Sequence, residues 1–96
     1  MRKLIRDKYD SIIEGERLTK AQNPSETFIL LREKISEELT ELADTAFNDI
    51  YEYADVIEVL YAMADFQGIS KDEIEIARLK KLDEKGGFRK CLVLKD

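Results

Sequence analysis

The segment over residues 49–66 constrains the fold of this chain more than any other. Read as a helix, it is apolar on nearly its whole circumference, through Ile50, Tyr53, Ala54, Val56, Ile57, Val59, Leu60, Tyr61 and Met63. Such a helix has no side suited to water and belongs in the middle of a helical bundle. The chain has 96 residues, and four short helices offer too little cover for this one within a single copy. We therefore expect a homodimer at least.

Helical periodicity and stop signals predict three further helices, over about residues 6–14, 25–45 and 71–84. The last of them opens on a capping box, in which Ser70 is followed three positions later by Glu73. Two short apolar runs, at residues 3–5 and 91–94, are candidates for a pair of short strands. The sequence thus predicts an all-α protein with one domain over residues 1–96. Its expected architecture is a compact four-helix bundle with a short strand pairing between the two ends.

Composition excludes several classes of protein. The net charge of −5 argues against binding to a nucleic acid polymer, because nothing offsets the repulsion from phosphate groups. A single cysteine allows no disulfide within the chain and fits a reducing compartment. The basic start is not followed by an apolar run, and no stretch approaches the ~20 apolar residues of a membrane span. We expect a cytoplasmic protein without a membrane partner.

The sequence contains no histidine, which limits the chemistry that it can perform. A histidine general base, a Ser-His-Asp triad and an ordinary catalytic zinc site all require an imidazole group. A catalytic site in this chain would have to use carboxylates, lysines, arginines and hard metal ions.

Two acidic pairs of the same shape lie in segments that otherwise resemble buried helix: Glu38 with Glu41, and Glu52 with Asp55. Their i, i+3 spacing places both carboxylates of each pair on one helix face. If the two helices pack antiparallel through a short turn, the four acids converge. Four like charges in a partly buried space repel one another strongly unless cations lie among them. Oxygen ligands without histidine or thiolate favour Mg²⁺, with Mn²⁺ as the second choice, ahead of zinc.

A solvated acidic face is the alternative interpretation of these pairs. Glutamate favours helices, and Glu-x-x-Glu spacing is common on helix surfaces that face water. The pattern alone leaves both interpretations open, although Glu52 falls inside an apolar stripe. The matching alternative function is a catalytically silent helical module that binds a protein partner or a nucleotide. An acidic mimic of nucleic acid fits the net charge but not the position of Glu52.

The acidic motif also resembles a known family. Glu-Glu-x-x-Glu followed by Glu-x-x-Asp is the motif of the MazG-like all-α nucleoside triphosphate pyrophosphohydrolases, which include phosphoribosyl-ATP pyrophosphohydrolase and the dimeric dUTPases. The opening "KLIRDKYDSIIEG" is similar to the "KLVRDKIPEII" opening of one branch. The segments "EYADVIEVLYAMADFQGIS" and "KGGFRKCLVL" resemble the third helix and the C-terminal part of that branch, so the similarity spans nearly the whole chain. The branch is often labelled phosphoribosyl-ATP pyrophosphohydrolase-like, which leaves the substrate open.

The resemblance implies hydrolysis of a nucleotide between its α- and β-phosphates, giving a nucleoside monophosphate and pyrophosphate. The implied magnesium ligands are Glu38, Glu41, Glu52 and Asp55. The resemblance implies that Glu37, the first acid of the motif, is an accessory ligand or the group that orients water. Glu37 and Glu38 are the implied catalytic residues. Basic side chains suit the phosphate tail of the substrate, and the candidates are Arg6, Lys8, Lys34 and Lys85. Solvated basic residues that pair with neighbouring acids are the alternative interpretation of these four.

Overall fold

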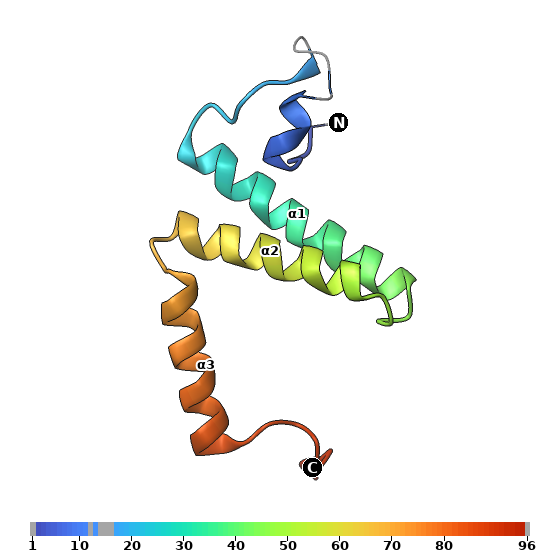
Figure 1. Ribbon diagram of the computed structural model, residues 1–96, viewed down its shortest axis with the longest axis vertical. Coiled ribbons are helices and arrows are strands. Elements are labelled where there is room, and N and C mark those ends of the chain that lie inside the picture. Colours follow the sequence, from blue (N-terminus) through green and yellow to red (C-terminus); the bar gives the residue numbers. More distant parts are fainter. Residues whose placement is uncertain (1, 12, 14–16, 96) are drawn as a thin grey trace.

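The computed structural model describes residues 2–11, 13 and 17–95. The described chain is helical and contains no strand (Figure 1). Its elements are a short 3₁₀ helix and three α-helices: η1 (Asp7–Ser11), α1 (Pro24–Asp44), α2 (Ile50–Phe66) and α3 (Lys71–Lys85). None of these helices is long and apolar enough to cross a membrane. The all-α prediction is confirmed for the described residues.

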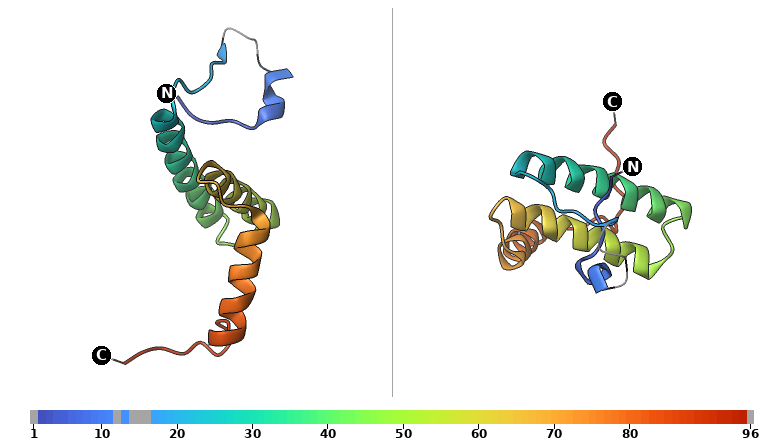
Figure 2. Two further views of the ribbon diagram at one scale, coloured as in Figure 1. Left: turned by 90° about the vertical axis from the view of Figure 1, so that its left-hand side faces the viewer. Right: turned by 90° about the horizontal axis from the view of Figure 1, so that it is seen from above.

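α1 and α2 form an antiparallel hairpin, and local capping sets its ends. The side chain of Asn23 accepts a hydrogen bond from the Glu26 backbone amide at 2.9 Å and starts α1, and Asp49 starts α2 by accepting from the Tyr51 amide at 2.8 Å. At the far end of the hairpin, the rings of Phe28 and Phe66 stack with centroids 6.2 Å apart. The two helices therefore lie side by side along their length (Figures 1 and 2).

The turn that joins α1 to α2 is tight and uses unusual backbone conformations. Ala46 and Phe47 both adopt positive φ, at 56° and 57°, which is uncommon for residues other than glycine. The hydroxyl of Tyr53 donates a hydrogen bond to the Phe47 carbonyl at 3.0 Å and holds the turn against the first turn of α2. This short connection brings the C-terminal half of α1 opposite the N-terminal half of α2.

α3 leaves the hairpin at a corner and does not fold back along it. Gly68, at φ 80°, closes α2, and the predicted capping box of Ser70 and Glu73 opens α3, with both of its hydrogen bonds at 3.1 Å. Beyond that corner α3 extends away from α1 and α2, and the C-terminal segment continues from its far end (Figures 1 and 2). The radius of gyration is 16.9 Å, whereas a compact domain of this length has about 12–13 Å.

This open shape corrects the predicted architecture. The described chain has three α-helices and not four. In place of the first predicted helix, over about residues 6–14, the structure has the short η1. Ile12 and residues 14–16 of that range lie outside the described part. The predicted pairing of residues 3–5 with 91–94 does not occur there either, because α3 carries the C-terminal run away from the N-terminal one (Figure 1). A compact four-helix bundle within one chain is not confirmed.

The core that remains is small and lies between α1 and α2. Its buried apolar side chains are Leu31 and Leu42 of α1, and no residue of α2 is buried. Because α2 is apolar on nearly its whole circumference, the sequence predicts that it lies in the middle of a bundle. In the structure, α1 covers it on one side only. Large apolar side chains are consequently exposed on α2 and α3, among them Ile57, Leu60, Ile76, Leu79 and Leu82.

Candidate metal centre

The hairpin brings the predicted acidic ligands together around Glu38. Carboxylate oxygens of Glu38, Glu52 and Asp55 lie within 4.8 Å of one another, and so do those of Glu37, Glu38 and Glu41. Glu38 belongs to both groups and is buried, while Glu52 and Asp55 are partly buried. The antiparallel packing of α1 on α2 thus produces the convergence that the spacing predicted. We call these five residues the acid cluster.

Two oxygens of the acid cluster have no hydrogen-bond donor within the described chain. Oε2 of Glu38 and Oε2 of Glu52 are both shielded from solvent and accept no hydrogen bond there. Burying a carboxylate oxygen without a partner is costly. A divalent cation between α1 and α2 would satisfy both oxygens, and carboxylate oxygens are the donors that hard cations prefer. The residues present therefore fit a divalent metal ion.

Like charges and burial raise the pKa of two members of the acid cluster. The pKa of Glu52 is raised by desolvation and by the neighbouring carboxylates of Asp55, Asp49 and Glu38. The pKa of Glu41 is raised in the same way, by desolvation and by Glu38, Glu37 and Glu52. Both shifts have burial as their largest cause, and the neighbouring carboxylates add to it.

Lys34 supplies part of the missing positive charge. Its Nζ lies 3.3 Å from Oε2 of Glu37 and 3.3 Å from Oε1 of Glu38, and its side chain is largely buried. Burial by itself lowers the pKa of this amine, but the hydrogen bonds and charges of Glu37 and Glu38 outweigh burial, so the pKa is raised. Lys34 therefore remains charged and serves as a fixed counter-ion on the α1 side of the acid cluster.

Two cations reach the acid cluster from the N-terminal segment. Arg6 Nη2 lies 2.6 Å from Oδ1 of Asp55, and Lys3 Nζ lies 3.7 Å from Oε1 of Glu37. The predicted phosphate-binding residue Arg6 is therefore at the centre, and its present partner is a carboxylate of the cluster. Lys85, in contrast, ends α3 and lies well away from the hairpin (Figure 1).

A cleft of about 760 Å³ lies between the N-terminal segment and the hairpin. That volume falls in the range of small-molecule sites, about 300–1,000 Å³. Arg6, Lys8 and Lys34 line it together with Glu38 and Asp55. The sequence does not predict the apolar wall of this cleft. Its one sign of that wall is the apolar run at residues 3–5, which predicts a short strand. The apolar wall consists of Leu4, Ile5, Tyr9, Leu31, Val59, Ala62 and Phe66.

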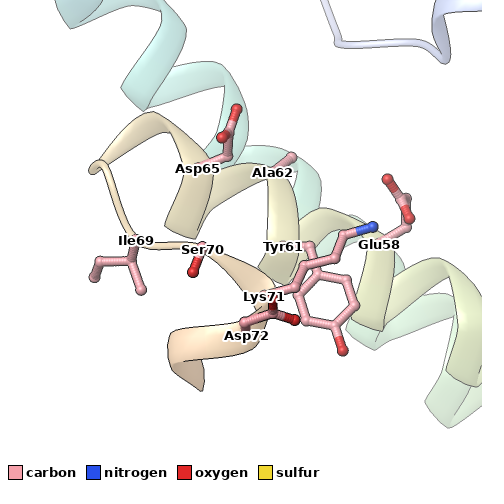
Figure 3. Close-up of a pocket in the computed structure, with 8 residues that line it drawn as sticks. All are labelled: Glu58, Tyr61, Ala62, Asp65, Ile69, Ser70, Lys71 and Asp72. Carbon is pink, nitrogen blue, oxygen red and sulfur yellow. The ribbon is translucent and has the colours of Figure 1, made fainter. Parts of the chain in front are cut away.

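A second hollow of about 550 Å³ lies at the corner between α2 and α3 (Figure 3). Lys71 lies over the ring of Tyr61 there, with Nζ 5.0 Å from the ring centroid. No member of the acid cluster lines this hollow. The cleft on the hairpin, in contrast, is lined by Glu38 and Asp55 of the acid cluster and by Arg6 and Lys8 of the N-terminal segment.

Comparison with protein-family models identifies a family for this chain. The family model described as phosphoribosyl-ATP pyrophosphohydrolase matches residues 6–81, a stretch that includes Arg6 and the whole acid cluster but not Lys85. Searches of curated proteins and of solved structures gave no significant match.

Proposed function

Because the chain belongs to the phosphoribosyl-ATP pyrophosphohydrolase family, we propose that it is a magnesium-dependent nucleotide pyrophosphohydrolase. Its substrate would be a nucleoside triphosphate or a nucleotide similar to phosphoribosyl-ATP. The reaction would break the anhydride between the α- and β-phosphates and release a nucleoside monophosphate and pyrophosphate. The observation that carries this proposal is Glu38, a buried carboxylate that is shared by two groups of acids and has an oxygen without a donor in the described chain.

Four residues would hold the metal: Glu38, Glu41, Glu52 and Asp55. When bound, Mg²⁺ (or Mn²⁺ in its place) neutralises phosphate charge and makes water a better nucleophile. Glu37 lies at the edge of the acid cluster, is only partly buried and contacts Lys34 and Lys3. Glu37 would orient the attacking water and accept its proton, as an accessory to Glu38.

Basic residues of the cleft would bind the phosphate tail. Arg6 can form bidentate hydrogen bonds to phosphate oxygens, and Lys8 and Lys34 act as point charges. Lys85 lies far along α3, so it would reach a nucleotide only in the site of another copy. The apolar wall of the cleft offers a surface for the nucleoside part of the substrate.

The same proposal includes a homodimer or tetramer. α3 packs on α2 only near their shared corner, and exposed apolar side chains remain on both helices. The α2 and α3 helices of two copies, four helices in all, could enclose these surfaces. The predicted four-helix bundle would then form between two chains and not within one. The observation behind this part of the proposal is that many large apolar side chains of α2 and α3 are exposed.

A screen of nucleoside triphosphates with detection of released pyrophosphate tests the proposal. We expect turnover with Mg²⁺ and none in EDTA. A chain that binds nucleotide without releasing pyrophosphate would instead support the silent binding module. Thermal stabilisation by Mg²⁺ alone provides a check that needs no substrate, because a solvated acidic face would give almost none.

A further inference from the structure

The N-terminal segment crosses the acid cluster, and ion pairs attach it to the hairpin. Arg2 pairs with Glu26 at 2.6 Å, Lys3 with Glu37 at 3.7 Å and Arg6 with Asp55 at 2.6 Å. The first two contacts lie on α1 and the third lies on α2. We call residues 2–9 the strap, because it crosses both helices of the hairpin (Figure 2, right).

The ion pairs of the strap are exposed to solvent. The side chains of Arg2, Lys3 and Arg6 are 53%, 61% and 57% exposed. Leu4 and Ile5 are only partly buried, and Tyr9 is 46% exposed. Ion pairs between exposed groups are weak and are screened by salt. A single ion pair of the strap can therefore exchange its partner at small cost.

Arg6 contacts Asp55, a carboxylate of the candidate metal site. Its guanidinium donates to Oδ1 of Asp55, and that carboxylate lies within 4.8 Å of oxygens of Glu38 and Glu52. A cation bound among these three acids would meet a fixed positive charge at close range. Coulomb repulsion between the metal ion and the Arg6 guanidinium therefore disfavours a state in which both contact Asp55.

We propose that Arg6 is an exchangeable counter-ion, which neutralises Asp55 before metal binds and is released from it when a divalent cation enters the acid cluster. The proposal rests on the metal site of the proposed function. Because the strap also forms one wall of the cleft, the released guanidinium stays beside the phosphate tail of a bound nucleotide. Arg6 thus couples metal binding to strap position, and the strap weakens metal binding until a nucleotide gives Arg6 a new anionic partner.

Metal binding by the full chain without nucleotide tests this exchange, with MnCl₂ as the probe and free Mn²⁺ followed by electron paramagnetic resonance. Arg6→Gln should bind Mn²⁺ about five- to tenfold more tightly than the unaltered chain, in the usual range of coupling between two sites. Arg6→Lys, which keeps the charge, should bind close to the unaltered chain.

Arg2→Gln is the matched control, because it removes the same charge from the same strap at a pair outside the acid cluster. It should change the Mn²⁺ affinity less than about twofold, since distant exposed charges are screened. Equal affinities for Arg6→Gln and the unaltered chain would overturn the exchange and leave the metal site standing. If neither chain binds Mn²⁺, the metal site fails and this proposal fails with it.

A second measurement follows Arg6 itself. In a nitrogen-15 NMR titration with MgCl₂, the side-chain Nε–H signal of Arg6, assigned with Arg6→Lys, should move toward that of a solvated arginine. The Arg2 signal should stay in place. An Arg6 signal that does not respond while Mg²⁺ binds would contradict the exchange, because a guanidinium that only supports the fold has no reason to move.

Discussion

The α1–α2 hairpin and α3 are equally well defined as helices, but they differ in what their side chains contact. The hairpin places helix against helix and buries Leu31, Glu38 and Leu42. α3 begins with a complete capping box and ends at Gly86, which has φ 79°, yet none of its residues is buried. Local sequence signals thus decide where a helix forms, whereas contacts with distant residues decide which of its side chains are buried.

The acids of the two regions show the same contrast. Glu52 on α2 is surrounded by other carboxylates, and burial and their charges raise its pKa. Glu75 on α3 accepts a hydrogen bond from Arg78 Nε at 3.0 Å, and this contact lowers its pKa. Glu52 and Glu75 therefore form a matched pair, in which one acid has like-charged neighbours and the other has a cationic partner.

The largest expected effect is on activity. Glu52→Gln removes a proposed metal ligand and should lower kcat/KM for the best nucleotide by about a hundredfold or more. Glu75→Gln makes the same chemical change on α3 and should leave kcat/KM within about twofold. Steady-state kinetics with pyrophosphate detection measure both. Similar losses in the two variants would show that the acid cluster has no special role.

The next prediction concerns the uncovered apolar face of α3. Ile76 and Leu79 are 69% and 49% exposed, and we expect a second copy to cover them. Ile76→Glu combined with Leu79→Glu should convert a dimer or tetramer into an 11.2 kDa monomer in sedimentation equilibrium. Glu84→Gln, on the same helix, is a control for altered surface charge. An unaltered chain that is already monomeric at micromolar concentration would contradict the proposed assembly.

A smaller effect is expected for the basic residues of the strap. Replacing Arg6 and Lys8 together with glutamine should raise KM about tenfold at saturating Mg²⁺, because two charges on the phosphate tail are lost. The melting temperature should change little, since the strap adds little to the core between α1 and α2. Unchanged kinetics would exclude both residues from substrate binding, and a collapse of the fold would show that they act mainly in structure.

The smallest effect is the pH dependence of the metal-free protein. A raised carboxyl pKa means that the folded state favours the protonated form of Glu52. Its contribution to stability is present below the ordinary value of 4.5 and is lost as pH rises through the raised pKa. Glu52→Gln in EDTA should therefore melt a few degrees above the unaltered chain near neutral pH. This difference should shrink as pH falls from about 7 to about 4.

Glu75→Gln should show the opposite sign. The lowered pKa of Glu75 gives stability that is present above the ordinary value of 4.5 and is lost as pH falls through the lowered pKa. This variant should melt slightly below the unaltered chain near neutral pH and approach it in acid. Melting curves of the three chains across this range measure both effects. The same sign in both variants would mean that the two acids have similar surroundings.

Much of the helical structure could be predicted from the sequence, because its signals lie within a few residues of one another. The ranges predicted for two helices, 49–66 and 71–84, agree with α2 and α3 within one or two positions, and Ser70 caps α3 as predicted. The convergence of Glu38 with Glu52 and Asp55 could also be predicted, since a short turn between two helices leaves little choice of register. Family membership follows from the same local motifs.

Only the tertiary structure decided the remaining features, and each of them joins residues far apart in the chain. Arg6 and Asp55 are separated by 49 positions, so no periodicity relates them, and their contact depends on the path of the irregular strap. Periodicity predicts a helix over about residues 6–14, but the described structure there is the five-residue η1. The course of α3 depends on what covers its apolar side chains. The sequence by itself determined which segments are helical and which acids share a face, because backbone hydrogen bonds and side-chain spacing are local. Packing between distant segments decided which cation faces the acid cluster and how much of α2 is covered.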